Sequence, residues 1–329
     1  MSQSIESNIS DPKTISKRLI SIDALRGFVM VIMLIDHVRE TFFLHMQVGD
    51  PVDVTITSPE LFFTRWASSI CAPVFIFLTG MSAYLYSTKY SIEKTSAFLF
   101  KRGLFLVILK LTLVVFLWTG KYPPDRYYLQ VIWCIGLCMI ALSGLIYLPR
   151  NFQIILGIII VSGHNLLDEF KVEAESNFFI PWAILYQREV FDIFDGIDAR
   201  TSYPILPWIG VILLGFYLGP WFAKNVSPAI RKKKLLKAGI IGLISFFVIR
   251  YANFYGDFPR INTGEALTTF MSFIPLTKYP PSLLFNLSML SIGLLLLVLF
   301  EKYEDNKLTN IMANFGAAPM FYYVFTWQF

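Results

Sequence analysis

Long apolar runs separated by short polar stretches dominate the chain, and they predict membrane helices. An apolar run of roughly 20 residues crosses the hydrocarbon layer of a bilayer as an α-helix. The pattern predicts about nine such helices, at Ile20–Phe43, Leu61–Tyr86, Arg102–Thr119, Leu129–Leu148, Phe152–Leu166, Pro204–Phe222, Leu235–Tyr251, Pro281–Phe300 and Asn310 to the end. Phe178–Tyr186 is apolar but too short to span, and we expect it at the membrane interface. The pattern therefore predicts an all-α fold, a polytopic transmembrane helix bundle.

The composition agrees with an integral membrane protein. Hydrophobic residues make up 55% of the 329 residues and charged residues only 16%, with a mean hydropathy of +0.58. Residues 1–19 are polar and carry no signal-peptide pattern, so we expect a cytoplasmic disordered tail there and a single membrane domain over 20–329. The net charge of +5 is modest, and the basic residues of the chain fall mostly in predicted loops. Nucleic acid is therefore not an expected partner.

The distribution of Lys and Arg predicts that the N-terminus is cytoplasmic. With this orientation the inner segments hold about twice as many Lys and Arg residues as the outer segments. The segment Asp168–Arg200 then lies outside, and it is rich in acidic residues. The basic run Arg231–Lys234 is most simply a signal for this topology, and binding of cofactor phosphates is the alternative.

The first predicted helix carries charged residues at both ends of its apolar run. Arg26 and His37 are eleven residues apart, a step of about 1100° at roughly 100° per residue, so they share a face about 16 Å apart. Asp23 lies three residues before Arg26 and can pair with it. Charged residues in a membrane usually face a bundle interior or a cavity, so this face predicts a site. The alternative is a membrane helix with ordinary polar ends.

Three histidines, His37, His45 and His164, are the candidate general bases, because imidazole takes up a proton near neutral pH. Asp36 precedes His37 and would fix its tautomer. The alternatives are a solvated helix end for His37, an interfacial anchor for His45 and a structural loop for His164. Lys110 lies deep in a predicted span and needs a partner. The sequence has no Ser nucleophile elbow, Walker loop or paired-Cys zinc pattern, so no metal is expected.

Five segments together resemble the bacterial membrane proteins related to heparan-alpha-glucosaminide N-acetyltransferase. They are IDALRGFVMVIMLIDHVRETFF (Ile22–Phe43), CAPVFIFLTGMSAYLY (Cys71–Tyr86), LPWIGVILLGFYLG (Leu206–Gly219), KYPPSL (Lys278–Leu283) and NFGAAPMFYYVF (Asn314–Phe325). These segments are spread over most of the chain, and their order fits the family. The Arg-x10-His spacing from Arg26 to His37 is also similar to the signature of the broader membrane acyltransferases that modify surface glycans.

The resemblance implies a bundle of about ten or eleven helices that brings acetyl-CoA to a sugar across the membrane. The related lysosomal enzyme has a catalytic His on the lumenal side, past its first helix, and local alignment with it favours His45. The Arg-x10-His signature selects His37 instead, and we favour His37 with His45 as the alternative. The family pattern usually has a His after an FYY-like motif, where this chain has Thr326. One or two further helices are expected after Phe329, so the sequence reads as C-terminally truncated.

The predicted function is transfer of an acetyl group from cytoplasmic acetyl-CoA, the co-substrate, to an amine or hydroxyl of an extracytoplasmic glycan or amino sugar. His37 or His45 would be the general base and Asp36 its orienting group, while Arg26 would hold an anionic part of the cofactor or pair with Asp23. Direct transfer and a ping-pong route through an acetyl-His are both open. A transporter or flippase of a sugar or lipid-linked substrate is the alternative, and a membrane scaffold is a third. We expect the protein among the lipids of a bacterial inner membrane, and a homo-oligomer is compatible with the sequence.

Overall fold

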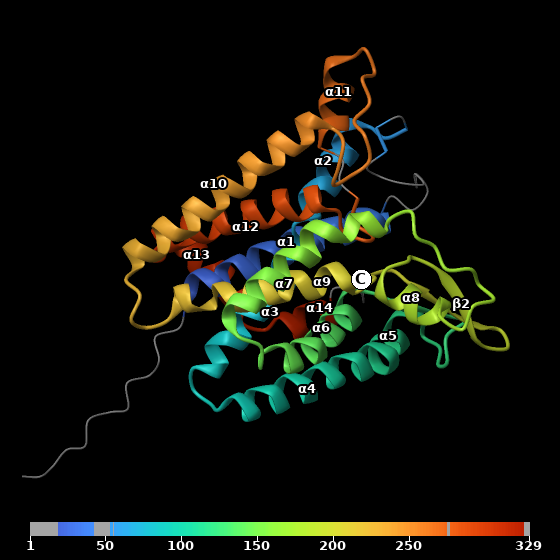
Figure 1. Ribbon diagram of the computed structural model, residues 1–329, viewed down its shortest axis with the longest axis horizontal. Helices are drawn as coiled ribbons and strands as arrows, with labels where there is room; N and C mark the ends of the chain where they lie inside the picture. Colours follow the sequence, from blue (N-terminus) through green and yellow to red (C-terminus); the bar gives the residue numbers. More distant parts are fainter. Residues whose placement is uncertain (1–18, 43–52, 55, 275–276, 326–329) are drawn as a thin grey trace, which may run out of the picture.

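Helices form most of the protein in the computed structural model, which describes residues 19–42, 53–54, 56–274 and 277–325. Three central helices are α1 (Ile20–Phe42), α3 (Cys71–Ser87) and α9 (Leu206–Leu218). Around them, most of the helices run in roughly the same direction across the molecule (Figure 1). The other α-helices are α2 (Pro59–Ser68), α4 (Ile92–Leu109), α5 (Val115–Thr119), α6 (Val131–Leu145), α7 (Arg150–Gly163), α8 (Phe179–Leu185), α10 (Pro228–Ala252), α11 (Ala266–Phe273), α12 (Leu283–Lys302), α13 (Lys307–Gly316) and α14 (Pro319–Phe325).

The predicted apolar segments are helical, but several of them are interrupted. The segment Leu61–Tyr86 is divided between α2 and α3, and the ninth is divided between α13 and α14. The third helix starts at Ile92, ten residues before its predicted start, because the Ser91 side chain accepts a hydrogen bond from the Lys94 N–H and caps it. It then passes through a π-helical turn at Lys110–Val114 before α5.

Three helical segments of the described chain are long and apolar enough to cross a membrane by length and composition, namely Pro59–Ser87, Pro228–Ala252 and Leu283–Lys302. The predicted bundle of about nine spans is therefore not confirmed as a whole. The exposed face of α10 is apolar, with Ile240, Ile244, Phe247 and Val248 among its exposed side chains. An apolar helix face on the outside of a bundle suits a surrounding of lipid.

A small sheet, which the all-α prediction did not include, lies at one end of the bundle. Its strands are β1 (Arg126–Leu129), β2 (Val190–Phe194) and β3 (Ile197–Thr201), in the order β1-β3-β2. β1 is parallel to β3 and β2 is antiparallel to it. Arg126 and Asp198 are register partners, and the guanidinium donates to the carboxylate at 2.6 and 2.7 Å. We call this the sheet end of the molecule.

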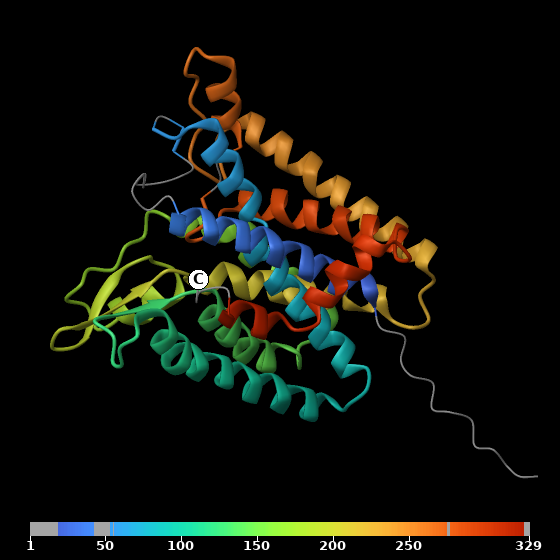
Figure 2. The same ribbon diagram turned by 180° about the vertical axis from the view of Figure 1, so that it is seen from behind.

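Pairs of helices packed along their length build the core. The most extensive pairs are α1 with α13, α4 with α6, α3 with α9 and α10 with α12. Seen from behind, α13 lies against the start of α1, so the last described segments return to the first helix (Figure 2). The largest fully buried side chain is Trp208 of α9. This packing fixes α1 between α3, α12 and α13, where Asp23 and Arg26 are half-buried and Asp36 is buried.

Candidate functional site

One face of α1 lines two neighbouring cavities. Arg26, Met30 and Met33 line the first cavity, and Met33, Asp36 and His37 line the second. These positions recur every three or four residues, which is the spacing of one helix face. The predicted shared face of Arg26 and His37 is present, and each residue opens on a different cavity.

The first cavity, which we call the distal cavity, has a volume of about 410 Å³. Its walls come from α1, α3, α4, α6 and the segment around α14, and they are mostly apolar. Its polar lining groups include Thr79, Ser82 and Arg102. A mostly apolar cavity with a few polar groups is typical of small-molecule sites.

Arg26 is held in the wall of the distal cavity by contacts to three helical segments. Its guanidinium donates to Asp23 Oδ1 at 2.7 Å, to the Gly316 carbonyl at 3.2 Å and to Ser82 Oγ at 3.4 Å. The pairing with Asp23 that their spacing predicted is therefore present. Arg26 ties α1 to α3 and to the end of α13 while it lines the cavity.

Two glycines bring α13 into direct backbone contact with α1 beside Arg26. A Cβ atom on Gly27 would lie 1.8 Å from the Met312 carbonyl oxygen, and one on Gly316 would lie 1.8 Å from the Asp23 carbonyl oxygen. Glycine at both positions lets the two helices approach closely, as small residues do in membrane bundles. This contact places the Gly316 carbonyl within reach of Arg26.

Aromatic and basic residues from the end of α3 and from α4 line part of the distal cavity. The rings of Tyr86 and Phe98 stack with centroids 4.2 Å apart, and the Arg102 guanidinium lies 6.0 Å from the Phe98 centroid. Arg102 is exposed, so this part of the cavity reaches the surface. We did not predict these residues from the sequence, because aromatic and basic residues are common at the ends of membrane helices.

The second cavity, which we call the sheet-end cavity, has a volume of about 310 Å³. It shares four wall residues with the distal cavity, so the two are neighbours: Met33, Phe75, Val131 and Tyr323. Its other lining residues come from α1, α2, α3, α5, the sheet, the residues that precede β2 or follow β1 and β3, and the loop before α12. The two cavities together form an interrupted path along the inside of the bundle.

An ion pair lies beside His37 in the sheet-end cavity. Arg65 of α2 donates to Asp36 Oδ2, and the Asp36 side chain is only 6% exposed. The carboxylate that was predicted to orient His37 is thus engaged with Arg65, a contact that the sequence did not predict. The role of Asp36 toward His37 stays a prediction.

Side chains from outside the apolar helices complete the sheet-end cavity. Arg188 precedes β2, Arg200 lies in β3, and Lys278 and Tyr279 lie in the loop before α12. The guanidinium of Arg188 and the ammonium of Lys278 lie 5.0 and 5.4 Å from the Tyr279 ring centroid. The Tyr279 hydroxyl donates to the Tyr203 hydroxyl at 3.4 Å. The cavity is therefore cationic and aromatic on this side.

Tyr279 reports a positive electrostatic potential in the sheet-end cavity. Burial disfavours ionisation of its phenol, but the cations Lys278 and Arg65 outweigh burial and lower its pKa from the ordinary value. A buried tyrosine without cationic neighbours would show the opposite shift.

Asp257 holds the loop that carries Lys278 and Tyr279. Its carboxylate accepts hydrogen bonds from the Thr277 N–H at 3.0 Å, from the Thr277 hydroxyl at 2.7 Å and from the Ser282 hydroxyl at 2.6 Å. Ser282 in turn caps α12. One carboxylate thus fixes both ends of the loop, and it is a positioning residue that sequence reasoning missed because its partners are 20 and 25 residues away.

Lys110 lies behind the wall of the sheet-end cavity. Its side chain is 1% exposed, its ammonium donates to Gln130 Oε1 at 3.0 Å, and it lies 3.7 Å from the centroid of the Trp118 ring. Both Gln130 and Trp118 line the cavity. The partners that Lys110 needs are therefore an amide and an aromatic face.

The other two histidines of the chain are His45 and His164. His45 falls outside the described residues. His164 is buried at the end of α7, and its Nδ1 lies 3.2 Å from the Tyr186 hydroxyl, which donates to Asp168. It lines neither cavity, so its surroundings are those of a structural residue.

The basic run Arg231–Lys234 is partly buried. Arg231 donates to Glu301 at 2.6 Å across α10 and α12. This pair joins two helices, so at Arg231 the run has a structural role that the sequence did not predict.

A family model described as heparan-alpha-glucosaminide N-acetyltransferase, catalytic, matches residues 18–251 of the chain. The match covers more than two thirds of the chain and confirms the resemblance seen in the sequence. It includes all of α1 and ends within α10, before the loop that carries Lys278. No curated protein matches the chain.

Proposed function

This chain belongs to the heparan-alpha-glucosaminide N-acetyltransferase catalytic family, and we propose that it transfers an acetyl group from acetyl-CoA to an amine or hydroxyl of a glycan. The family supports a membrane acetyltransferase acting on a glycan. Acetyl-CoA as the donor and His37 as the general base are our proposals for this chain.

The observation that carries the proposal is the wall that the two cavities share. A transferase that takes its substrates from opposite sides of a membrane needs two pockets that meet at the reacting atoms. The distal and sheet-end cavities share Met33, Phe75, Val131 and Tyr323. His37 lines the sheet-end cavity one helical turn after the shared Met33. Two substrates held in this way react as neighbours, which supplies much of the rate enhancement of an enzyme.

The distal cavity fits the donor. Its volume of about 410 Å³ is near the lower end of the range for ligand pockets, roughly 300–1,000 Å³. This volume suits the narrow, largely apolar acetyl-pantetheine arm and leaves the nucleotide at the surface. Arg102 would meet the phosphates there and the stacked Tyr86 the adenine. Arg26, which is already paired with Asp23, adds a further donor group to the wall.

His37 would act on the acceptor in the sheet-end cavity. The acceptor nitrogen or oxygen attacks the thioester carbonyl carbon, the new C–N or C–O bond forms, and the C–S bond breaks. His37 takes the proton of the attacking group, and the thiolate of CoA leaves and is then protonated. The alternative ping-pong route places the acetyl group first on a His37 nitrogen.

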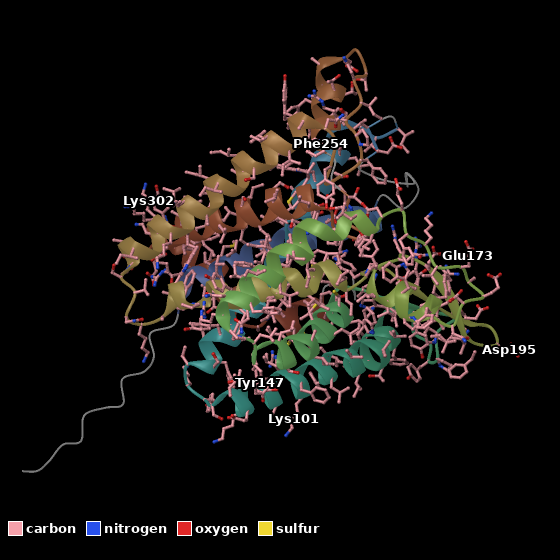
Figure 3. All side chains as sticks on the ribbon, in the orientation of Figure 1. Lys101, Tyr147, Glu173, Asp195, Phe254 and Lys302 are labelled. Atoms are coloured by element: carbon pink, nitrogen blue, oxygen red, sulfur yellow. The ribbon has the colours of Figure 1, made fainter. Side chains whose placement is uncertain are left out.

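The charges at the two ends support the predicted orientation. Glu173 and Asp195 lie beyond the sheet at one end, while Lys302 lies at the opposite end (Figure 3). With the positive end in the cytoplasm, the distal cavity faces the pool of acetyl-CoA. Single cysteines at positions 233 and 173 test this with an impermeant thiol reagent, in a background without the three native cysteines. Labelling of position 233 from outside intact cells would contradict the orientation.

Labelled acetyl-CoA tests the function directly. Membranes that contain the full chain should transfer the label to a glycan fraction, and calorimetry on the solubilised protein should show binding of acetyl-CoA at millimolar concentration or below. Binding should weaken with added salt if basic groups meet the phosphates. Two neighbouring cavities that share wall residues would also suit a transporter or flippase. That function is favoured if no acetyl-CoA binds and an unmodified sugar crosses proteoliposomes.

A further inference from the structure

Positive charge is concentrated in the sheet-end cavity. Four cationic side chains line it, namely Arg65, Arg188, Arg200 and Lys278. Asp36 is the one acidic side chain among the described residues that line it, and Arg65 already pairs with Asp36. Neither Arg200 nor Lys278 has a carboxylate opposite it in the described part of this wall.

In the segment between α7 and α9, a basic side chain of the sheet lines the cavity and acidic side chains of the sheet do not. Along the sequence this segment is rich in acidic residues, yet Asp192 and Asp195 are exposed to solvent, and Asp195 lies beyond the sheet (Figure 3). Asp198 is used by Arg126. Arg200 instead lines the cavity, in the central strand β3, where it is register partner of both Tyr128 and Val190. The acidic side chains that would neutralise the cavity are therefore held away from it.

A further basic side chain lies behind the wall. The buried Lys110 ammonium donates to Gln130 and faces Trp118, and no ion pair joins it to a carboxylate of the described chain. The lowered pKa of Tyr279 is a second sign of the same potential, because Lys278 and Arg65 cause it.

We propose that the acceptor is an anionic sugar unit, with a phosphate or carboxylate group on the ring that enters the sheet-end cavity, and that Arg200 and Lys278 bind this group. The inference rests on the proposed function, since it names the class of acceptor for the same site. The volume of about 310 Å³ suits one sugar unit and its anionic group rather than a longer segment of a chain. The two residues come from β3 and from the loop that Asp257 fixes, so the anion site is rigid.

Equilibrium binding without acetyl-CoA tests this proposal. Calorimetry on the full chain in detergent compares glucose 6-phosphate with glucose, and glucuronate with glucose. At least one anionic sugar should bind about tenfold more tightly than its neutral partner, as a single charge-assisted contact provides. The preferred pair identifies the phosphate or the carboxylate. Added salt should reduce the preference.

Variants identify the residues responsible. Arg200→Gln and Lys278→Gln should each reduce the preference several-fold, and together they should abolish it while binding of the neutral sugar is retained. Arg200→Lys keeps the charge and should keep most of the preference. Lys171→Gln is the matched control, because it removes an exposed positive charge from the same segment without touching the cavity.

Equal binding of both members of each pair, no binding of either anionic sugar, or a preference that survives in the double variant would overturn the proposal. These results are distinct from failure of the proposed function. A chain that prefers anionic sugars but does not bind acetyl-CoA keeps the anion site and loses the transferase function. A chain that binds acetyl-CoA and binds both members of each sugar pair equally keeps the transferase function and loses the anion site.

Discussion

Arg65 of α2 donates a hydrogen bond to Asp36 of α1, and the pair lies in the same cavity wall as His37. The two side chains are 20% and 6% exposed. An ion pair that is shielded to this degree contributes little by its formation, but removing one partner leaves the other charge without compensation.

Asp36→Asn should therefore destabilise the protein by about 2–3 kcal/mol, somewhat less than the loss from a fully buried pair because Arg65 keeps some contact with water. Thermal unfolding in detergent measures the change. The control is Asp125→Asn, which breaks the exposed pair with Lys121 and should cost less than about 1 kcal/mol. Equal effects of the two substitutions would contradict the importance of burial at Asp36.

Gly27→Ala should separate α13 from α1. The new Cβ would meet the Met312 carbonyl oxygen at 1.8 Å, and a backbone atom cannot yield as a flexible side chain does. We expect a loss of about 1–3 kcal/mol or more, as overpacking gives. Binding of acetyl-CoA should also weaken, because Arg26 would lose the Gly316 carbonyl.

Gly144→Ala is the matched control for Gly27→Ala, because it lies in α6 and, apart from its chain neighbours and its own helix backbone, no atom lies within 4 Å of the added Cβ. It should be neutral or slightly stabilising. If the Gly27→Ala variant unfolds at the same temperature as the Gly144→Ala variant, the result contradicts the direct backbone contact between α1 and α13 at Gly27.

Asp257→Asn should impair acceptor binding more than turnover. One oxygen of the carboxylate becomes an NH₂ group, so at least one hydrogen bond to Thr277 or Ser282 is lost and the loop with Lys278 loosens. We expect KM for the acceptor to rise several-fold while kcat changes little. Asp192→Asn, on the exposed face of β2, should leave both constants unchanged. A lower kcat with an unchanged KM would rule out the positioning role.

In the first helix, the main structural features could be predicted from the sequence alone. The apolar run and its charged ends predicted Ile20–Phe43 for the observed Ile20–Phe42, and the three-residue and eleven-residue spacings predicted the Asp23–Arg26 pair and the face shared with His37. These are local properties of one helix, so periodicity is sufficient to predict them.

Contacts between distant segments could not be predicted in this way. Arg200 and Lys278 meet in one cavity because a short sheet and a loop converge, and neither has a hydrophobic pattern. The sheet was missed because its strands have only four or five residues and lie in a segment with many charges. Asp36 was expected to serve its neighbour His37, but Arg65 approaches from α2.

The Arg126–Asp198 pair predicts a dependence on pH at the sheet. The Arg126 guanidinium holds the pKa of Asp198 below its usual value. The carboxylate is therefore ionised more readily in the folded protein than in the unfolded chain. The stabilisation of the folded state by the ionised Asp198 is present above about pH 4, and it is lost as the pH falls through the lowered pKa. Amide exchange in Ile197–Thr201, corrected for the intrinsic rate, should accelerate at about pH 3 relative to pH 5. Arg126→Gln should remove this dependence, and exchange that is unaffected by the substitution would contradict the pairing.

The last prediction concerns His37, which lines the sheet-end cavity beside the residues shared with the donor side. If it is the general base, His37→Ala should reduce acetyl transfer roughly 10²–10⁴-fold. Binding of acetyl-CoA should be retained, because the imidazole acts on the proton of the acceptor. His37→Gln should be nearly as inactive, since an amide keeps a hydrogen bond but cannot take up a proton. Transfer of labelled acetyl groups and calorimetry measure the two effects separately.

His45→Ala distinguishes His37 from its alternative, since the family signature selects one histidine and the alignment to the lysosomal relative selects the other. Full loss in His37→Ala with activity kept in His45→Ala supports His37 as the base. The reverse result assigns the base to His45 and leaves His37 as a cavity residue. Loss in both, with each variant shown to be folded and inserted, means that the two histidines serve one site. In that case a labelled acetyl group trapped on one of them after rapid mixing identifies the ping-pong route, and its absence identifies direct transfer.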